Sequence, residues 1–251
     1  MKTTSTPVAA VPPITRTEVG GIAATENQRV LDLLRSLDEG EWSRPTPDCP
    51  AWDVRALAAH VLGGMEAFVS PRSFVHQMRA AAKAKGDGKL IDGMTAAQVS
   101  ERAGLSRDEL LTRLAEVGPR VARARTRVPG LLRRLPMKEE VGGVPETWRL
   151  GYLLDVVLTR DTWMHRVDIA RATGRELVLT PEHDGRLVAD VVAEWARRHG
   201  RPFTLRLEGP AGGTFTRDGG GEDITIDAVE FCRTLSGRVG GAGLLTQEVP
   251  F

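Results

Sequence analysis

The sequence lacks a strong charge of either sign and lacks any long hydrophobic run. Its 251 residues include 34 Lys and Arg and 33 Asp and Glu, which gives a formal net charge of +1 at pH 7. Proteins that bind nucleic acids or anionic membranes over a broad surface carry a clear excess of basic residues. No apolar stretch approaches the roughly 20 residues that span a bilayer. We therefore expect neither nucleic acid nor a membrane as a partner.

Cysteine is also scarce, and the two cysteines, Cys49 and Cys232, lie far apart and form no CxxC pair. This pattern argues against a disulfide framework and favours the cytoplasm as the compartment. Prolines interrupt the N-terminus, which contains no continuous apolar stretch of signal-peptide length. We predict a flexible tail over residues 1–20 and a cytoplasmic protein.

Apolar residues recur at helical spacing in four long segments that follow this tail. Asp53 and Ser106 stand where they can cap two of the helices. The predicted helices cover residues 25–39, a segment after Asp53, a segment after Ser106, and residues 145–171. Residues 79–104 lack clear periodicity and predict a long irregular connection. Together these segments predict a four-helix bundle over residues 21–176.

The pattern changes after Gly174, where strand-like alternation replaces the long helical stripes. A Thr-Pro pair at residues 180–181 predicts the start of a helix that continues to about residue 198. A final helix is expected to begin at Asp227, after short strands at residues 203–207, 214–216 and 224–226. Residues 177–251 are therefore predicted to form a small α+β domain.

Polar residues interrupt the apolar stripe of the fourth predicted helix. Continued in helical steps from Leu150, this stripe reaches Asp161, His165 and Asp168. A carboxylate buried in a bundle core without a partner loses its hydration at a cost of several kcal/mol. Asp161 and His165 are spaced i, i+4, so their side chains are neighbours on one helix face. They can therefore bind one metal ion, which would neutralise the buried carboxylate.

His60, on the second predicted helix, is the candidate for a third ligand. It flanks the apolar stripe of that helix, and Gly63 and Gly64 leave room for an ion one turn later. Taken singly, a His near an apolar face is more often an ordinary core residue. An Asp and a His at this spacing can equally form a surface pair. The residues alone leave both interpretations open.

Three segments together make the pattern specific: CPAWDVRALAAHV over residues 49–61, DTWMHRVDIARATG over residues 161–174, and DAVEFCRTLSGR over residues 227–238. They resemble the mycothiol-dependent maleylpyruvate isomerase family. The resemblance implies an N-terminal DinB-like four-helix bundle that binds a metal ion, followed by a small α+β domain. The implied activity is that of an isomerase or transferase that uses mycothiol, a sugar-containing thiol, on a small electrophile.

The resemblance also implies the ligands of a divalent metal ion, expected to be Zn²⁺: His60, Asp161 and His165. The family places Glu at the position of Asp161, so the carboxylate here is closer to the helix by about one bond length, roughly 1.5 Å. Two His and a carboxylate suit catalytic zinc and also non-haem iron. Such an ion lowers the pKa of a thiol. The thiolate adds to an electron-poor double bond, and elimination then completes a cis–trans isomerisation, whereas a stable adduct is an S-conjugate.

Several further polar residues have two interpretations each. Asp168 can orient a ligand His, or it can form an ion pair with Arg166 or Arg171. Arg238 is our candidate catalytic residue, which would hold a substrate carboxylate, although it can also be an exposed residue at a helix end. Cys49 is assigned no role. We interpret a run of arginines as a solvated helix face rather than a nucleic-acid patch: Arg120, Arg123, Arg125, Arg127, Arg133 and Arg134.

Three other functions compete with the isomerase interpretation. The nearest is a mycothiol S-transferase in detoxification or secondary metabolism. A non-catalytic metal-binding protein is a second, but a structural zinc site is closed by four protein ligands and the sequence offers three. A DNA-associated stress protein is a third, which a salt-dependent DNA-binding assay would reveal. The sequence does not define the electrophile or the oligomeric state.

Overall fold

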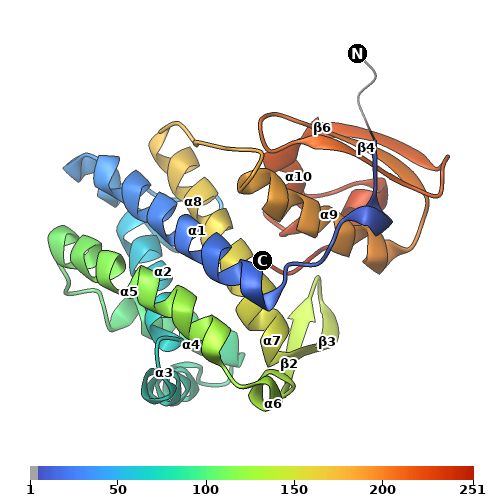
Figure 1. The fold of residues 1–251 in the computed structure, drawn as a ribbon. Helices are drawn as coiled ribbons and strands as arrows, with labels where there is room; N and C mark the ends of the chain where they lie inside the picture. Colours follow the sequence, from blue (N-terminus) through green and yellow to red (C-terminus); the bar gives the residue numbers. More distant parts are fainter. Residues whose placement is uncertain (1–4) are drawn as a thin grey trace. The chain divides into compact units, whose positions relative to one another are not determined.

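The computed structural model describes residues 5–251, whose contacts divide the chain into two units (Figure 1). The helical unit comprises Arg16–Arg133 and Leu154–Leu177. The sheet unit comprises the described residues up to Thr15, together with Arg134–Leu153 and Val178–Phe251. The predicted domain limits, 21–176 and 177–251, remain a prediction.

The four long helices of the helical unit form a bundle, in which α1 packs against α5 and α8, and α2 packs against the same two helices (Figure 1). Their bounds are α1 Arg16–Ser36, α2 Val54–Ala67, α5 Arg107–Arg127 and α8 Leu158–Thr173. Buried aliphatic side chains fill the space between them, among them Val30, Leu34, Leu57, Leu62, Leu110, Leu114 and Ile169. The predicted fold class, a helical bundle with a small α+β part, is confirmed.

Local signals set the ends of the helices that carry the candidate ligands. The Asp53 side chain accepts a hydrogen bond from the backbone nitrogen of Ala56 at 2.8 Å, so it caps α2 as predicted. Gly174 ends α8 in the left-handed conformation, with a φ of 71°. Ser106 and Glu109 form the expected capping box at the start of α5.

The structure corrects the predicted helix boundaries of the helical unit in two places. Helix α1 begins at Arg16 rather than at residue 25, so residues 16–20, which the sequence assigned to the tail, form its first turn. Its stripe is hard to recognise because Glu26 and Asn27 are buried among the apolar residues. Residues 79–104, predicted as irregular, lie largely in α3 (Pro71–Ala84) and α4 (Leu90–Ser100), which pack against each other.

A β-hairpin stands where the fourth predicted helix was expected to begin. Strands β2 (Pro136–Val141) and β3 (Val144–Arg149) pair antiparallel, and Gly142 and Gly143 connect them with φ values of 56° and 78°. Positive φ at both central residues is typical of a type I′ turn, which matches the twist of paired strands. The prediction was wrong here because a proline and an acidic residue at 145–146 resemble a helix start. Helical structure begins only at α7 (Leu150–Tyr152) and passes through a π-helical turn, Leu153–Val157, into α8.

The sheet unit has a four-stranded sheet in the order β1-β5-β4-β6. Its strands are β1 Thr6–Pro7, β4 Phe203–Glu208, β5 Gly213–Arg217 and β6 Glu222–Asp227. Helices α9 (Asp184–His199) and α10 (Ala228–Leu235) contact β5 and β4, respectively, and Trp195 packs its ring 4.7 Å from that of Phe203. The three predicted strands are therefore present, whereas α9 begins at Asp184 rather than at residue 180.

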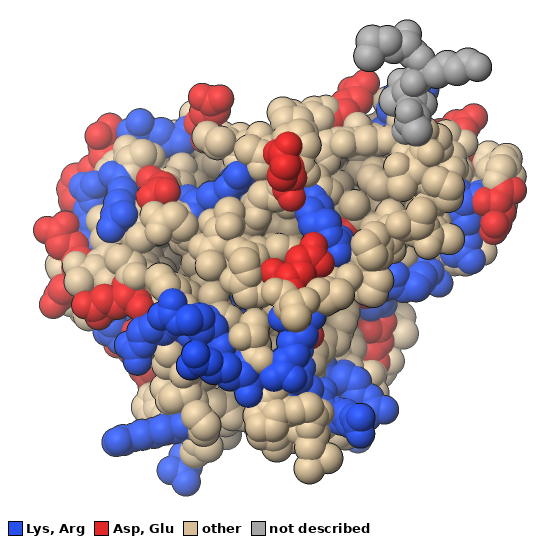
Figure 2. Space-filling model, viewed as in Figure 1, with Lys and Arg blue, Asp and Glu red and all other residues tan. Residues whose placement is uncertain are grey.

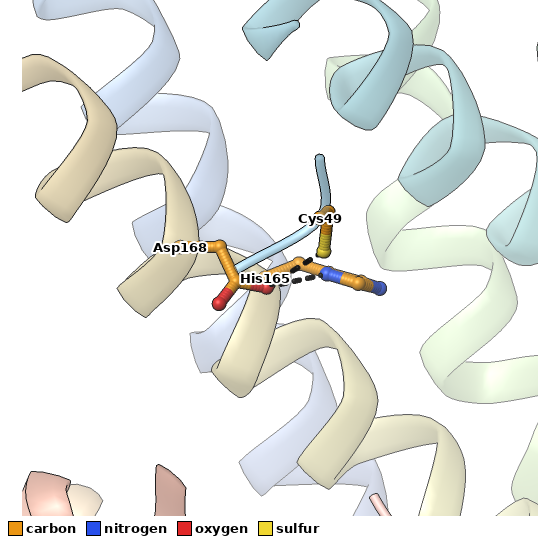
Figure 3. A group of neighbouring side chains, drawn as sticks. All are labelled: Cys49, His165 and Asp168. Atoms are coloured by element: carbon orange, nitrogen blue, oxygen red, sulfur yellow. Dashed lines mark hydrogen bonds and ion pairs between the residues drawn. The ribbon is translucent and has the colours of Figure 1, made fainter. Parts of the chain in front are cut away.

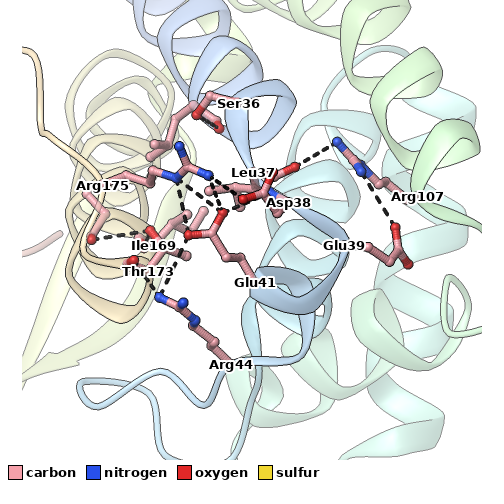
Figure 4. A network of polar contacts seen from close by, with 12 residues as sticks. Ser36, Leu37, Asp38, Glu39, Glu41, Arg44, Arg107, Ile169, Thr173 and Arg175 are labelled. Carbon is pink, nitrogen blue, oxygen red and sulfur yellow. Dashed lines mark hydrogen bonds and ion pairs between the residues drawn. The ribbon is translucent and has the colours of Figure 1, made fainter.

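A polar network links the residues that follow α8 to the connection between α1 and α2 (Figure 4). Arg175 donates hydrogen bonds to Glu41, the shortest at 2.6 Å, and contacts Asp38 at 3.1 Å. The hydrogen bond from Arg175 lowers the pKa of Glu41. Arg44 donates to the backbone oxygen of Thr173 at 2.6 Å. These contacts fix the chain that leads into α2 relative to the end of α8.

None of the helices in residues 5–251 combines the length and the hydrophobicity that a membrane span requires.

Candidate metal centre

The structure brings together the three candidate ligands that the sequence indicated. His60 comes from α2, and Asp161 and His165 come from successive turns of α8. One ligand atom from each lies within 4.8 Å of the others. The His165 Nε2 atom is 3.3 Å from Asp161 Oδ1, and the rings of His60 and His165 lie 4.9 Å apart, edge to face. This arrangement allows all three side chains to contact one ion.

The three residues differ in their access to solvent. His60 is 9% exposed and His165 is 6% exposed, whereas the Asp161 side chain is 36% exposed. Asp161 is therefore the member of the group that solvent reaches most readily.

Burial keeps His60 neutral. It lowers the pKa of His60 to about 4, with a further contribution from the charge of His165, while Asp161 and a hydrogen bond with Gln98 act in the opposite direction. The Nδ1 atom of His60 is buried and has no hydrogen-bond partner among residues 5–251. A buried polar atom without a partner is costly. A neutral imidazole with an unsatisfied nitrogen fits the requirements of a metal ligand.

His165 has polar partners at both ring nitrogens. Its Nδ1 atom is 2.9 Å from Oδ2 of Asp168, which is fully buried. Burial by itself would lower the pKa of His165, but the charge of Asp161 and hydrogen bonds with Asp161, Asp168 and Cys49 raise it well above its usual value. Because a carboxylate accepts, we assign the proton to Nδ1. When the doubly protonated ring loses the proton on Nε2, the lone pair of Nε2 faces Asp161.

The contacts of Arg166 and Arg171 bear on the role of Asp168. Arg166 donates to Glu26 at 2.7 Å, and Arg171 lies 3.3 Å from Asp48. Both arginines therefore have carboxylate partners elsewhere, and Asp168 contacts His165. This geometry favours Asp168 as the residue that orients a candidate ligand.

Cys49, which the sequence left without a role, lies beside the same pair (Figure 3). Its Sγ atom is 3.6 Å from Asp168 Oδ2. Potential ligand atoms of Cys49, His165 and Asp168 lie within 4.8 Å of one another, as those of the first group do. The signal for Cys49 was its place in segment 49–61, four residues before Asp53, the N-cap of α2, but spacing alone cannot bring it to α8.

The other residues that the sequence singled out are Arg238 and the arginine run around α5. Arg238 belongs to the sheet unit, where it follows α10 and is half-buried, and its backbone nitrogen donates to the oxygen of Arg233 at 3.0 Å. Basic side chains gather over α5 in Figure 2. Arg125 is an exception, because it is buried and donates to Thr159 at 3.2 Å. Arg133 is also withdrawn from solvent and pairs with Asp155.

Comparison with known proteins identifies the family. The model of the mycothiol maleylpyruvate isomerase N-terminal domain matches residues 23–170. The chain belongs to this family. His60, Asp161 and His165 all lie within the matched residues, and Arg238 lies outside them.

Two crystal structures share the fold of this family member: one of the mycothiol-dependent maleylpyruvate isomerase and one of a histidine-to-alanine variant. Each has 16% sequence identity and a TM-score of 0.56. The first comparison covers 94% of this chain and 94% of the other, and the second covers 93% and 92%. A comparison with curated proteins gives no significant match. At this identity the two structures establish the fold rather than the substrate.

Proposed function

We propose that this protein is a metal-dependent enzyme that uses mycothiol to act on a small electrophile, as in the isomerisation of maleylpyruvate. The observation that carries this proposal is the convergence of His60, Asp161 and His165 inside the bundle of a chain that belongs to this family. We propose these three residues as the ligands of one divalent ion, with zinc as the expected metal.

The donor set supports this assignment. His60 is uncharged at neutral pH because its pKa is about 4, and it has a buried ring nitrogen without a partner. Asp161 supplies one negative charge toward the ion. Three protein ligands leave a coordination position open, as catalytic zinc sites do, whereas structural sites are closed by four. A bound divalent ion lowers the pKa of a thiol and thereby supplies a thiolate at neutral pH.

The chain's own residues would hold and orient the reactants. Asp168 would fix the ring of His165 through Nδ1, so that Nε2 is directed at Asp161. We propose that Arg238 binds a carboxylate of the substrate, because its guanidinium is planar and permanently charged. Addition of the thiol sulfur to the double bond forms a carbon–sulfur bond. The electron pair of the double bond moves onto the conjugated carbonyl, so the former double bond becomes a carbon–carbon single bond. After rotation about this carbon–carbon bond, the enolate re-forms the double bond and expels the thiolate, which leaves the trans isomer and returns the thiol.

A mycothiol S-transferase is the second candidate, because the same residues would support addition without the final cleavage. One assay separates the two. Purified protein is incubated with maleylpyruvate with and without mycothiol, and the mixture is analysed by liquid chromatography and mass spectrometry. We expect mycothiol-dependent conversion to the trans isomer with no net consumption of thiol.

Accumulation of a thioether with other electrophiles would instead support the transferase. Protein that carries a full equivalent of metal but gives neither product with a panel of electrophiles would contradict the enzymatic proposal. It would favour a non-catalytic metal-binding protein.

A further inference from the structure

The turn that precedes α2 is held rigidly by its own backbone and by Thr46. The backbone nitrogen of Thr46 donates to the oxygen of Trp52 at 3.1 Å, and that of Trp52 donates to the oxygen of Cys49 at 2.9 Å. The Thr46 hydroxyl donates to the oxygen of Cys49 at 2.7 Å. Pro45 and Asp53 form an isolated β-bridge across the base of the turn. The Cys49 and Trp52 side chains are therefore presented from a fixed backbone.

The Cys49 side chain contributes to the environment of Asp168. Its thiol donates to Asp168 Oδ2 at 3.6 Å, and the same oxygen accepts from His165 Nδ1 at 2.9 Å (Figure 3). Asp168 is 0% exposed, and a buried carboxylate is stable only where donors replace its lost hydration. Cys49 is one such donor. Its contact restrains the carboxylate oxygen that sets the orientation of the His165 ring.

The Trp52 side chain contacts the other candidate ligand. Its ring lies 5.0 Å from the ring of His60, with an angle of 32° between the ring planes. The His60 side chain is almost fully buried, and its Nδ1 atom has no hydrogen-bond partner among residues 5–251. Packing against neighbouring side chains therefore contributes much of what fixes the orientation of the His60 ring. One short turn thus supports both histidines: Trp52 packs on the ring of His60, and Cys49 acts on His165 through Asp168 and through its own hydrogen bond with the imidazole.

We propose that the turn Cys49–Trp52 positions the two histidine ligands of the metal ion, with Cys49 acting through Asp168 and Trp52 acting on the ring of His60. This inference rests on the proposed metal site. Both residues are positioning residues. Cys49 and Asp168 lie at Nδ1 of His165, whereas Asp161 lies at Nε2, so the cysteine supports the ligand from the nitrogen that the metal does not use.

The test uses the full-length protein, stripped of metal with a chelator and reloaded with Co²⁺ or Zn²⁺. Zinc affinity is measured by competition with a chromophoric chelator, and the geometry of the Co²⁺ site is followed by visible absorption. We expect Cys49→Ala to lower zinc affinity roughly ten- to a hundredfold and to change the Co²⁺ bands, as removal of an outer-shell partner does. Cys49→Ser, which keeps a donor, should restore most of the affinity.

Three further variants sharpen the result. Trp52→Phe keeps a ring against His60 and should retain most of the affinity that Trp52→Ala loses. Cys232→Ala removes the other cysteine, which lies in the sheet unit, and should leave metal affinity unchanged. Circular dichroism of each metal-free variant shows whether it has folded before its affinity is compared.

The inference fails if Cys49→Ala binds zinc as tightly as the wild type with an unchanged Co²⁺ spectrum. It also fails if the wild-type Co²⁺ protein shows a thiolate charge-transfer band that disappears in Cys49→Ala, because Cys49 would then be a ligand. Wild-type protein that binds no metal would overturn the proposed function as well. The first outcome leaves the proposed function intact, and the second changes its ligand set while the protein still binds metal. Both are therefore distinguishable from a failure of the proposed function, in which no metal binds.

Discussion

His165 and Arg166 are adjacent on α8, yet they belong to two buried polar groups of different kinds. Arg166 donates to both carboxylate oxygens of Glu26, at 2.7 and 3.2 Å, so charge and hydrogen bonds are matched within the pair. Around His165, by contrast, His60 retains an unpartnered ring nitrogen and Asp161 remains partly exposed. The first group is complete as an ion pair, and the second retains an unpartnered ring nitrogen that an ion could use. The comparison separates a group that stabilises the bundle from one that is available for chemistry.

The largest effect is expected from removing a ligand of the incomplete group. His60→Ala and His165→Ala should each lose most bound metal while the bundle remains folded. The loss in affinity should exceed the roughly ten- to hundredfold effect of an outer-shell change. Elemental analysis of the purified variants measures the metal, and circular dichroism checks the fold. Retention of a full equivalent by both variants would show that these histidines are not ligands.

Breaking the Glu26–Arg166 pair should have the opposite effect, a large loss of stability with metal binding retained. Arg166→Met leaves the Glu26 carboxylate buried without its guanidinium, and the free energy of unfolding should fall by about 3–5 kcal/mol. The folded fraction should still bind one metal ion. Chemical denaturation measures the loss, and the exposed Arg35→Met is a matched control that should cost less than about 1 kcal/mol. The double change Glu26→Leu with Arg166→Met should recover much of the stability, and failure of Arg166→Met to destabilise would contradict the comparison.

The two histidines should give the metal-free protein a maximum of stability near pH 6.5. Between about pH 4 and 6.5 the unfolded chain binds a proton that folded His60 does not, so stability rises with pH by roughly 3 kcal/mol from this residue. Above pH 6.5, folded His165 holds a proton that the unfolded chain releases, because its pKa is raised, so its contribution is lost as pH rises. Metal binding should displace this proton and remove the decline at high pH.

Denaturation across this pH range, with and without Zn²⁺, measures both effects. Other carboxylates also titrate at low pH, so the His60 contribution is the difference between the wild type and His60→Gln. A difference that does not change between pH 4 and 6.5 would contradict the assignment of a neutral, buried His60.

A smaller effect is expected at Arg238, which lies outside both groups. Arg238→Ala should leave metal content unchanged and reduce kcat/KM about tenfold to a hundredfold, because a charge-assisted hydrogen bond contributes about 1.5–3 kcal/mol. Arg238→Lys should recover only part of the loss, since an ammonium group makes no bidentate contact. The exposed Arg206→Ala is the control. If Arg238→Ala retains the wild-type kcat/KM, Arg238 does not bind the substrate and is an ordinary half-buried residue at a helix end.

The comparison also shows which parts of the structure the sequence could predict. Asp53, Ser106 and Gly174 act within one or two turns of their own positions, so local spacing was enough to place the ends of α2, α5 and α8. The i, i+4 spacing of Asp161 and His165 likewise follows from helix geometry. Joining them to His60 required the resemblance to a family, because that contact connects two helices.

Features that depend on distant partners were missed. Glu26 reads as a surface residue until Arg166 is known to face it, and this concealed the start of α1. Cys49 contacts Asp168 across 119 positions of sequence, which no local pattern encodes. The hairpin did have a local signal, the Gly142–Gly143 pair, but the proline that follows was interpreted as the start of a helix. The first two features depend on tertiary contacts, whereas in the third the turn chemistry of the glycine pair overruled the predicted helix start.

The most direct test of the account is a metal titration of wild-type protein and two variants at Asp161. The carboxylate should supply the charge that offsets the cation, so chelator-treated wild-type protein should bind one equivalent of Zn²⁺ and Asp161→Asn should bind it more weakly. Asp161→Glu, the residue that the family places there, should bind as tightly as the wild type or more tightly. Equal zinc affinity of the wild type and Asp161→Asn would contradict the claim that His60, Asp161 and His165 form the metal site.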